Sequence, residues 1–119
     1  MDRVRTKRVY DPVDGDDGYR VLVDRLWPRG IRKSDLPHDE WLKEVSPSGA
    51  LRRWFGHDPE RFEAFAERYQ QELAGNEEVE RLTEIAADRR LTLLYAAKDR
   101  EHNHAIVLAE VLSDRLRER

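Results

Sequence analysis

The sequence contains no cysteine. This absence excludes disulfide bonds, catalysis by a thiolate, cysteine-based zinc sites and iron–sulfur clusters. At 119 residues the chain has the usual size of one independently folding unit, and we predict a single domain over residues 1–119.

Long apolar runs and a strong charge of one sign are also missing. The longest apolar run is far below the roughly 20 residues of a membrane span. The basic start MDRVRTKRV has no apolar stretch behind it. We therefore expect a cytoplasmic protein with no membrane partner. The net charge of −3 combines 22 basic with 25 acidic residues, so no overall field attracts nucleic acid.

Motifs for metals and cofactors are absent as well. No glycine pattern typical of phosphate loops or dinucleotide binding occurs. His102 and His104 are separated by one residue and would point to different faces of a helix, against shared metal ligation. The acidic segment 11–17 lacks the EF-hand register, because Arg25 stands where the closing glutamate is needed. We expect neither a metal site nor a cofactor.

Short apolar runs, turn residues and capping residues divide the chain into strands and helices. Strands are predicted over residues 4–10, 19–26 and 91–97, with a weaker candidate over residues 41–45. Helices are predicted after the capping residues Ser46, Asp58 and Asn76, and a last one from about Asn103 to Leu116. Gly56 and Gly75 are predicted to end the first two helices.

This order of elements predicts an α/β fold. We expect a mainly parallel sheet of about four strands flanked by helices, in a Rossmann-like three-layer arrangement. The connection over residues 11–18 is short for a helical crossover, which takes at least about 10–12 residues. An antiparallel pairing of the first strand is therefore left open.

Polar sequences follow the two strands with the clearest apolar runs. Ligands of open α/β sheets bind beyond the carboxyl ends of the strands, so segments 24–33 and 98–104 are predicted to face one cleft. Arginine can hold phosphate or carboxylate through two parallel hydrogen bonds, and a helix N-terminus favours an anion. The predicted ligand-binding residues are Arg25, Trp27, Arg29, Lys33, Lys98 and Asn103, and the predicted proton-transfer residues are Asp24, Asp99 and His104.

Each of these residues also has a structural interpretation. Arg25 and Asp24 can pair with surface charges, and Trp27 can anchor the core while its N–H meets a carbonyl. Asp99 can cap a helix, and a lone histidine such as His104 is usually a hydrogen-bonded structural residue. The sequence leaves anion recognition and structural ion pairing nearly balanced.

Four stretches carry a family resemblance: RVYDP at residues 8–12, DGYRVLVDRLWPRGIRK at 17–33, EWLKEVSPSGALRRWFGHDPERF at 40–62 and LLYAAKDREHNHAIVL at 93–108. Together they resemble the YeaO-like branch of the domain of unknown function 488. The resemblance implies a compact α/β fold of prokaryotic intracellular origin. It further implies, for the wider group, cysteines at the positions of Tyr95 and Asn103 and a histidine at that of His104. This chain lacks both cysteines, so a thiol mechanism does not transfer.

The leading hypothesis is a cleft that binds an anionic small molecule, such as a phosphate ester or nucleotide, with or without catalysis. The alternative is a non-enzymatic regulatory or protein-interaction module with Trp41, Trp54 and Phe55 partly exposed. A DNA-binding regulator is the least favoured function, because the helix predicted over residues 59–74 is net acidic and would repel phosphates.

Overall fold

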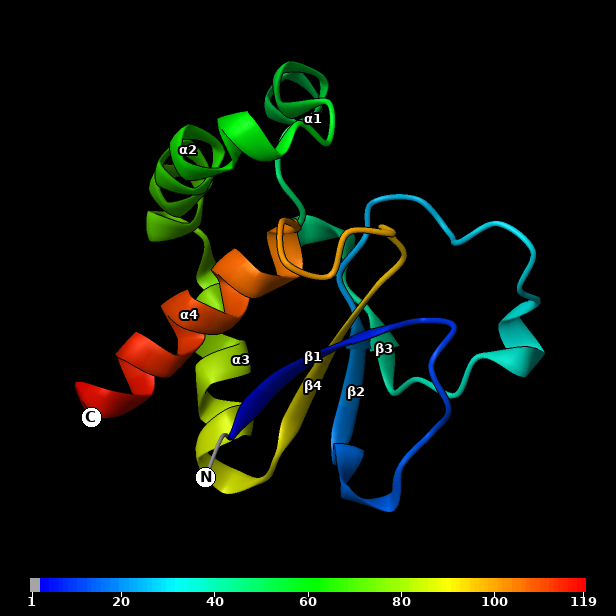
Figure 1. The fold of residues 1–119 in the computed structure, drawn as a ribbon. Helices are drawn as coiled ribbons and strands as arrows, with labels where there is room; N and C mark the ends of the chain where they lie inside the picture. Colours follow the sequence, from blue (N-terminus) through cyan, green and yellow to red (C-terminus); the bar gives the residue numbers. More distant parts are fainter. Residues whose placement is uncertain (1–2) are drawn as a thin grey trace.

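The computed structural model describes residues 3–119 (Figure 1). Along the described residues three strands come first, three helices follow, and a fourth strand and a fourth helix end the chain, with four short 3-10 turns between the earlier elements. The strands are β1 (Val4–Arg8), β2 (Tyr19–Leu22), β3 (Glu40–Trp41) and β4 (Leu91–Tyr95), and the helices are α1 (Gly49–Phe55), α2 (Phe62–Ala74), α3 (Glu77–Asp88) and α4 (His104–Arg117).

The four strands form one sheet in the order β1-β4-β2-β3, and every neighbouring pair is parallel. The prediction of an α/β fold with about four mainly parallel strands is confirmed. β4 lies between β1 and β2, and all five of its residues are buried. This central position explains the uninterrupted LTLLY run, because a strand covered on both faces needs apolar side chains on both.

The antiparallel alternative for the first strand is wrong. β1 runs parallel to β4, from Val4 opposite Leu91 to Arg8 opposite Tyr95. The crossover to β2 contains no α-helix and does not need one. A five-residue strand is roughly 17 Å long, and the ten residues that connect β1 to β2 can reach roughly 33 Å when extended. A short irregular chain can therefore return to the start of the sheet.

The helices cover one face of the sheet, so the expected three-layer arrangement is also wrong. All four helices contribute side chains to one apolar core with Val21, Val23, Leu91 and Leu93 of the strand regions. Figure 1 shows the helices together on one side of the sheet and the segment after β2 on the other. On that second face Leu22 and Leu94 pack with side chains of this irregular segment, including Leu36 and Trp27. None of the helices described within residues 3–119 is long and apolar enough to cross a membrane.

Capping residues set most helix ends as the sequence predicts. Asn76 accepts a hydrogen bond from the backbone N–H of Glu78 and begins α3, and Gly56 ends α1 in the left-handed conformation. The predicted cap Ser46 is wrong. Ser48 caps α1 instead, while the Ser46 hydroxyl donates to the carbonyl of Lys43. The segment predicted as a strand over residues 41–45 continues β3 only to Trp41 and then turns.

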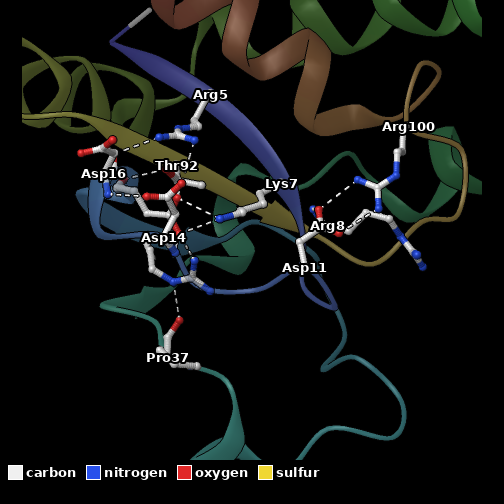
Figure 2. Close-up of polar contacts among 11 residues, drawn as sticks. Arg5, Lys7, Arg8, Asp11, Asp14, Asp16, Pro37, Thr92 and Arg100 are labelled. Carbon is white, nitrogen blue, oxygen red and sulfur yellow. Dashed lines mark hydrogen bonds and ion pairs between the residues drawn. The ribbon is translucent and has the colours of Figure 1, made fainter.

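A cluster of ion pairs around Asp17 lies on the second face of the sheet, the face that the helices do not cover. The Asp17 carboxylate is buried, 1% exposed, and is contacted by Lys7 at 3.0 Å and by the Arg20 guanidinium. Arg5 lies 3.8 Å from it, and Figure 2 shows Arg5 and Lys7 reaching from β1 into this cluster. Burial alone would raise the pKa of Asp17, but the backbone N–H of Asp14 together with Lys7 and Arg20 holds the pKa below its usual value. The carboxylate is therefore charged when the protein is folded.

Candidate functional site

A pocket of about 570 Å³ lies beyond the carboxyl ends of β2 and β4. This is the position at which ligands bind in open parallel sheets, and the volume falls in the range of roughly 300–1,000 Å³ typical of small-molecule sites. The segment after β2, the region around α1, the segment after β4 and one residue of α2 form its wall. The lining residues are Asp24, Arg25, Leu26, Trp27, Pro28 and Arg29 after β2; Ser46, Pro47, Arg52, Arg53, Phe55 and His57 around α1; Phe65 of α2; and Ala96, Ala97, Asn103 and His104 after β4.

Asp24 and His104 join the two strand ends at this pocket. The Oδ1 atom of Asp24 lies 3.2 Å from Nε2 of His104, and its Oδ2 atom accepts from the backbone N–H of Ala96 at 3.1 Å. The same Nε2 atom is 3.1 Å from the carbonyl oxygen of Val23. Because both neighbours of Nε2 are acceptors, this nitrogen carries the hydrogen. Asp24 is thus oriented by the backbone that directly follows β4, and the Val23 carbonyl accepts the hydrogen bond of His104. Among residues 3–119 the buried Oδ1 atom of Asp24 has no hydrogen-bond partner.

Tyr69 of α2 packs against the His104 ring. Its ring lies edge-on to His104, with 6.4 Å between the ring centroids, and its hydroxyl donates to the carbonyl of Val45. Burial raises the pKa of Tyr69 far above its usual value, so the hydroxyl remains a donor. The contact ties α2 to the turn that precedes α1, which forms one wall of the pocket.

The charge of the pocket is strongly positive. Four of its lining residues are arginines, namely Arg25, Arg29, Arg52 and Arg53, and one is acidic, Asp24. All four arginines are exposed, and within residues 3–119 none of their guanidinium groups has an ion pair or hydrogen bond to an acidic side chain. The Asp24 carboxylate lies 3.2 Å from Nε2 of His104. In a chain whose net charge is −3, four guanidinium groups that have no acidic partner among residues 3–119 therefore line one cavity.

Six of the nine predicted site residues line this pocket: Asp24, Arg25, Trp27, Arg29, Asn103 and His104. The two polar segments therefore do meet at one cavity, although the roles predicted for these residues stay predictions. Besides Asp24 and His104, two more of the six have structural contacts. Asn103 is the N-cap of α4, accepting from the N–H of Ile106 at 3.0 Å, and the Trp27 indole donates to the carbonyl of Ile31 at 2.6 Å.

Lys33, Lys98 and Asp99 lie outside the lining. Lys33 is over the rings of Trp27 and Trp41 on the second face, 5.8 and 5.6 Å from their centroids. Asp99 accepts from the N–H groups of Glu101 and His102 and contacts the His102 ring at 2.9 Å. These backbone N–H groups and the His102 ring hold the pKa of Asp99 below its usual value.

The segment that carries Lys98 and Asp99 is drawn toward β1 and away from the pocket. Arg100 makes two hydrogen bonds to the Asp11 carboxylate, at 2.8 and 2.9 Å, and Figure 2 shows the pair beside the end of β1. β1 and β2 lie on opposite sides of β4, and the pocket is on the β2 side. The sequence predicts that polar residues follow β4, but it does not reveal to which side the segment turns.

The sequence interpretation missed the α1 wall of the pocket, including Arg52, Arg53 and His57. The available signal was the pair of adjacent arginines in RRWFGH, which precedes a helix-ending glycine. Nothing in the local pattern brings that segment to the ends of β2 and β4, because the packing of α1 on α2 decides it. Within residues 3–119 no group of three or more His, Cys, Asp or Glu side chains is arranged to hold a metal ion.

The aromatic residues of the interaction-module hypothesis have different environments. Trp41 and Trp54 are partly exposed as predicted, whereas Phe55 is buried, 5% exposed, and that expectation is wrong. Phe55 stacks on Phe65 with 4.3 Å between centroids, and this stacking takes it into the core. The Trp54 ring is covered by the guanidinium groups of Arg68 and Arg61, at 4.0 and 5.3 Å.

Comparison with known proteins gives one family. A family model described as an inactive DUF488-N3 subclade matches residues 3–119. The chain is 54% identical over 110 residues to the uncharacterized protein YeaO of Escherichia coli, covering 92% of this chain and 96% of that protein. It is 47% identical over 113 residues to the uncharacterized proteins Mb3100c of Mycobacterium bovis and Rv3073c of Mycobacterium tuberculosis, covering 95% of this chain and 96% of each. No solved structure gives a significant match.

Proposed function

The chain belongs to the DUF488 family, in its inactive N3 subclade, and we propose that its pocket binds an anionic small molecule such as a phosphate ester or a nucleotide. The observation that carries this proposal is the excess of positive charge at one cavity. Four guanidinium groups and a single carboxylate line the pocket, and the carboxylate lies 3.2 Å from Nε2 of His104. Unpaired arginines gathered on two walls would repel one another unless an anion lay between them.

The apolar part of the lining suits an organic ligand rather than a bare inorganic ion. Phe55 and Phe65 contribute ring surface, and Pro28, Pro47 and Ala97 add further apolar area. Pockets of this kind bury the body of a ligand against apolar groups and fix its orientation by a few polar contacts. We therefore expect a charged group at the arginines and a ring or chain against the phenylalanine side.

Binding without turnover is the simpler form of this function. The family description supports it, since the subclade is termed inactive. The sequence supports it too, because it holds no cysteine and thus neither of the two thiols that the family resemblance implies for the wider group. Asp24, Arg25 and His104 would then serve recognition, with His104 held by its hydrogen bond to the carbonyl of Val23.

A direct test is calorimetric titration with inorganic phosphate, pyrophosphate, sugar phosphates and adenosine mono- and diphosphates. We expect at least one organic phosphate to bind, and we expect Arg25→Ala and Arg29→Ala each to weaken that binding by about tenfold, the value of one charge-assisted hydrogen bond. Arg32→Ala is the matched control. It removes the same charge from the same loop, yet Arg32 is paired with Asp35 and lies outside the pocket.

Two results would count against the proposal. One is that no probe binds with a dissociation constant below about 1 mM, the range of nonspecific contact. The other is that Arg32→Ala weakens binding as much as Arg25→Ala, which would mean that the probe senses only overall charge.

A second candidate function is proton transfer by Asp24 and His104, and their 3.2 Å contact at the pocket wall is the observation that favours it. It is tested by incubating the wild-type protein with any phosphate ester that binds and measuring phosphate release. Release that His104→Ala abolishes, with binding retained, would establish turnover. No release from a bound ester would leave binding as the function.

A further inference from the structure

His57, at the rim of the pocket, has a backbone conformation that side chains rarely adopt. Its φ is 57°, and it is the only non-glycine residue with a positive φ within residues 3–119. It follows Gly56, which also lies in the left-handed region, at φ 54° and ψ 29°. In this region the Cβ atom crowds the backbone, which penalises residues other than glycine, although histidine is among those found there more often.

The turn after α1 does not need the imidazole. Two backbone hydrogen bonds close it, from the N–H of Gly56 to the carbonyl of Arg52 and from the N–H of Asp58 to the carbonyl of Phe55, both at 3.0 Å. The His57 residue is exposed, and its ring makes no hydrogen bond or ion pair to any residue in the described range 3–119. Its aromatic contact is Phe55, with 6.0 Å between the ring centroids. The fold therefore explains the turn but not the presence of a histidine in it.

The position of His57 in the pocket gives a reason for a histidine in this turn. His57 lines the same cavity as the four arginines, on the wall formed around α1. Arg25 and Arg29, in the segment after β2, also line this cavity. An anion held in the cavity could meet guanidinium groups from both segments and an imidazole N–H from the α1 segment. An imidazole N–H is a suitable donor to a phosphate or carboxylate oxygen.

We propose that His57 is a ligand-contacting residue, which donates a hydrogen bond from the α1 wall to an oxygen of the bound anion. This inference rests on the proposed function and adds to it a specific contact. It explains why a histidine stands at a left-handed position where glycine would be less strained. Strain retained at the rim of a pocket is typical of residues kept for binding and not for folding.

The experiment compares His57→Gly and His57→Asn with the wild type, by thermal melting and by titration with the organic phosphate that binds the wild type most tightly. His57→Gly removes the donor and relieves the strained backbone. We expect it to melt at or above the wild-type temperature and to bind the probe about tenfold or more weakly, as the loss of a hydrogen bond to a charged group predicts. Asparagine tolerates the left-handed region and keeps an N–H donor, so His57→Asn should recover part of the affinity.

The outcomes separate the two proposals. If His57→Gly binds within about twofold of the wild type while Arg25→Ala is weakened by about tenfold, the pocket binds anions but His57 does not contact them, and this inference is wrong. A His57→Gly variant that melts well below the wild type would also overturn it, since the side chain would then act in folding. If the wild type binds no probe, the proposed function itself fails.

Discussion

Replacing Asp17 by asparagine tests whether a buried carboxylate holds the second face of the sheet together. Asp17 is 1% exposed, and its oxygens accept from Lys7, Arg20 and the backbone N–H of Asp14. Asparagine keeps one oxygen but turns an NH2 donor toward a cationic donor, and it leaves Lys7, Arg20 and Arg5 without a counter-charge. Removing one partner of a buried ion pair costs about 3–5 kcal/mol. That is a large share of the roughly 5–15 kcal/mol that stabilises a domain.

The loss should be visible in thermal and urea unfolding followed by circular dichroism. With an unfolding entropy of about 2.1 cal/mol/K per residue, 3–5 kcal/mol lowers the melting temperature of this chain by roughly 12–20 °C. Asp16→Asn is the matched control, because Asp16 is an exposed aspartate in the same turn. We expect it to change stability by less than about 0.5 kcal/mol.

The pH dependence gives an independent check on the cause. The pKa of Asp17 is lowered in the folded protein, so the carboxylate contributes its full stabilisation above the unfolded pKa of about 3.9. The contribution is lost as the pH falls through the lower pKa of the folded state. The gap in stability between wild type and Asp17→Asn should therefore be constant near neutral pH and shrink below about pH 4. A gap as small as that of Asp16→Asn, or one that does not change with pH, would refute the reasoning.

Two further substitutions test contacts that shape the sheet and the pocket wall. Tyr69→Phe keeps the ring beside His104 but removes the hydroxyl that donates to Val45, and since both residues are fully buried we expect a loss of about 1–3 kcal/mol in urea unfolding. A loss below about 0.5 kcal/mol would mean that another donor reaches that carbonyl. Gly18→Ala places a Cβ atom 2.2 Å from the carbonyl oxygen of Arg90 at a φ of 66°, and we expect it to cost more than about 2 kcal/mol. Gly30→Ala is its control, because Gly30 also has a positive φ, 79°, but has no atom within 4 Å of the added Cβ. Equal losses for the two alanine variants would show that the backbone conformation and not the close approach sets the cost.

The elements were predictable from the sequence because their signals are local. The apolar run of β4 and the cap Asn76 depend on residues a few positions apart, and the structure contains both at the predicted places. The direction of β1 was not predictable, because it depends on the path of an irregular connection. The side on which the helices lie was missed for a related reason. The apolar residues Leu22 and Leu94 predict a helix on that face of the sheet. Trp27 and Leu36 of an irregular segment cover them instead.

The residues of the candidate site also differ in whether local sequence or tertiary packing decides their position. The polar residues that follow β2 line the pocket because they continue directly from a strand end, as Asp24 and Arg25 do. Lys98 and Asp99 also follow a strand end, but a long-range ion pair between Arg100 and Asp11 turns their segment toward β1. Arg52 belongs to α1 and His57 to the turn after it, both distant in sequence from the strand ends, and their approach depends on how α1 packs against α2.

The two positions at which the family resemblance implies cysteines for the wider group are both buried in this structure. In this chain they are Tyr95, which is 2% exposed at the end of β4, and Asn103, which is 1% exposed. The Asn103 side chain accepts from the N–H of Ile106 and donates to the carbonyl of Asp99, so it caps α4 and ties the helix to the preceding segment. A thiol accepts hydrogen bonds only weakly, and loss of such a cap costs about 1 kcal/mol. Asn103 thus acts in folding, whereas within residues 3–119 the guanidinium groups of the four pocket arginines and the His57 ring form no hydrogen bond or ion pair. The fold therefore does not use this positive charge, and the charge is available at the cavity to hold an anion.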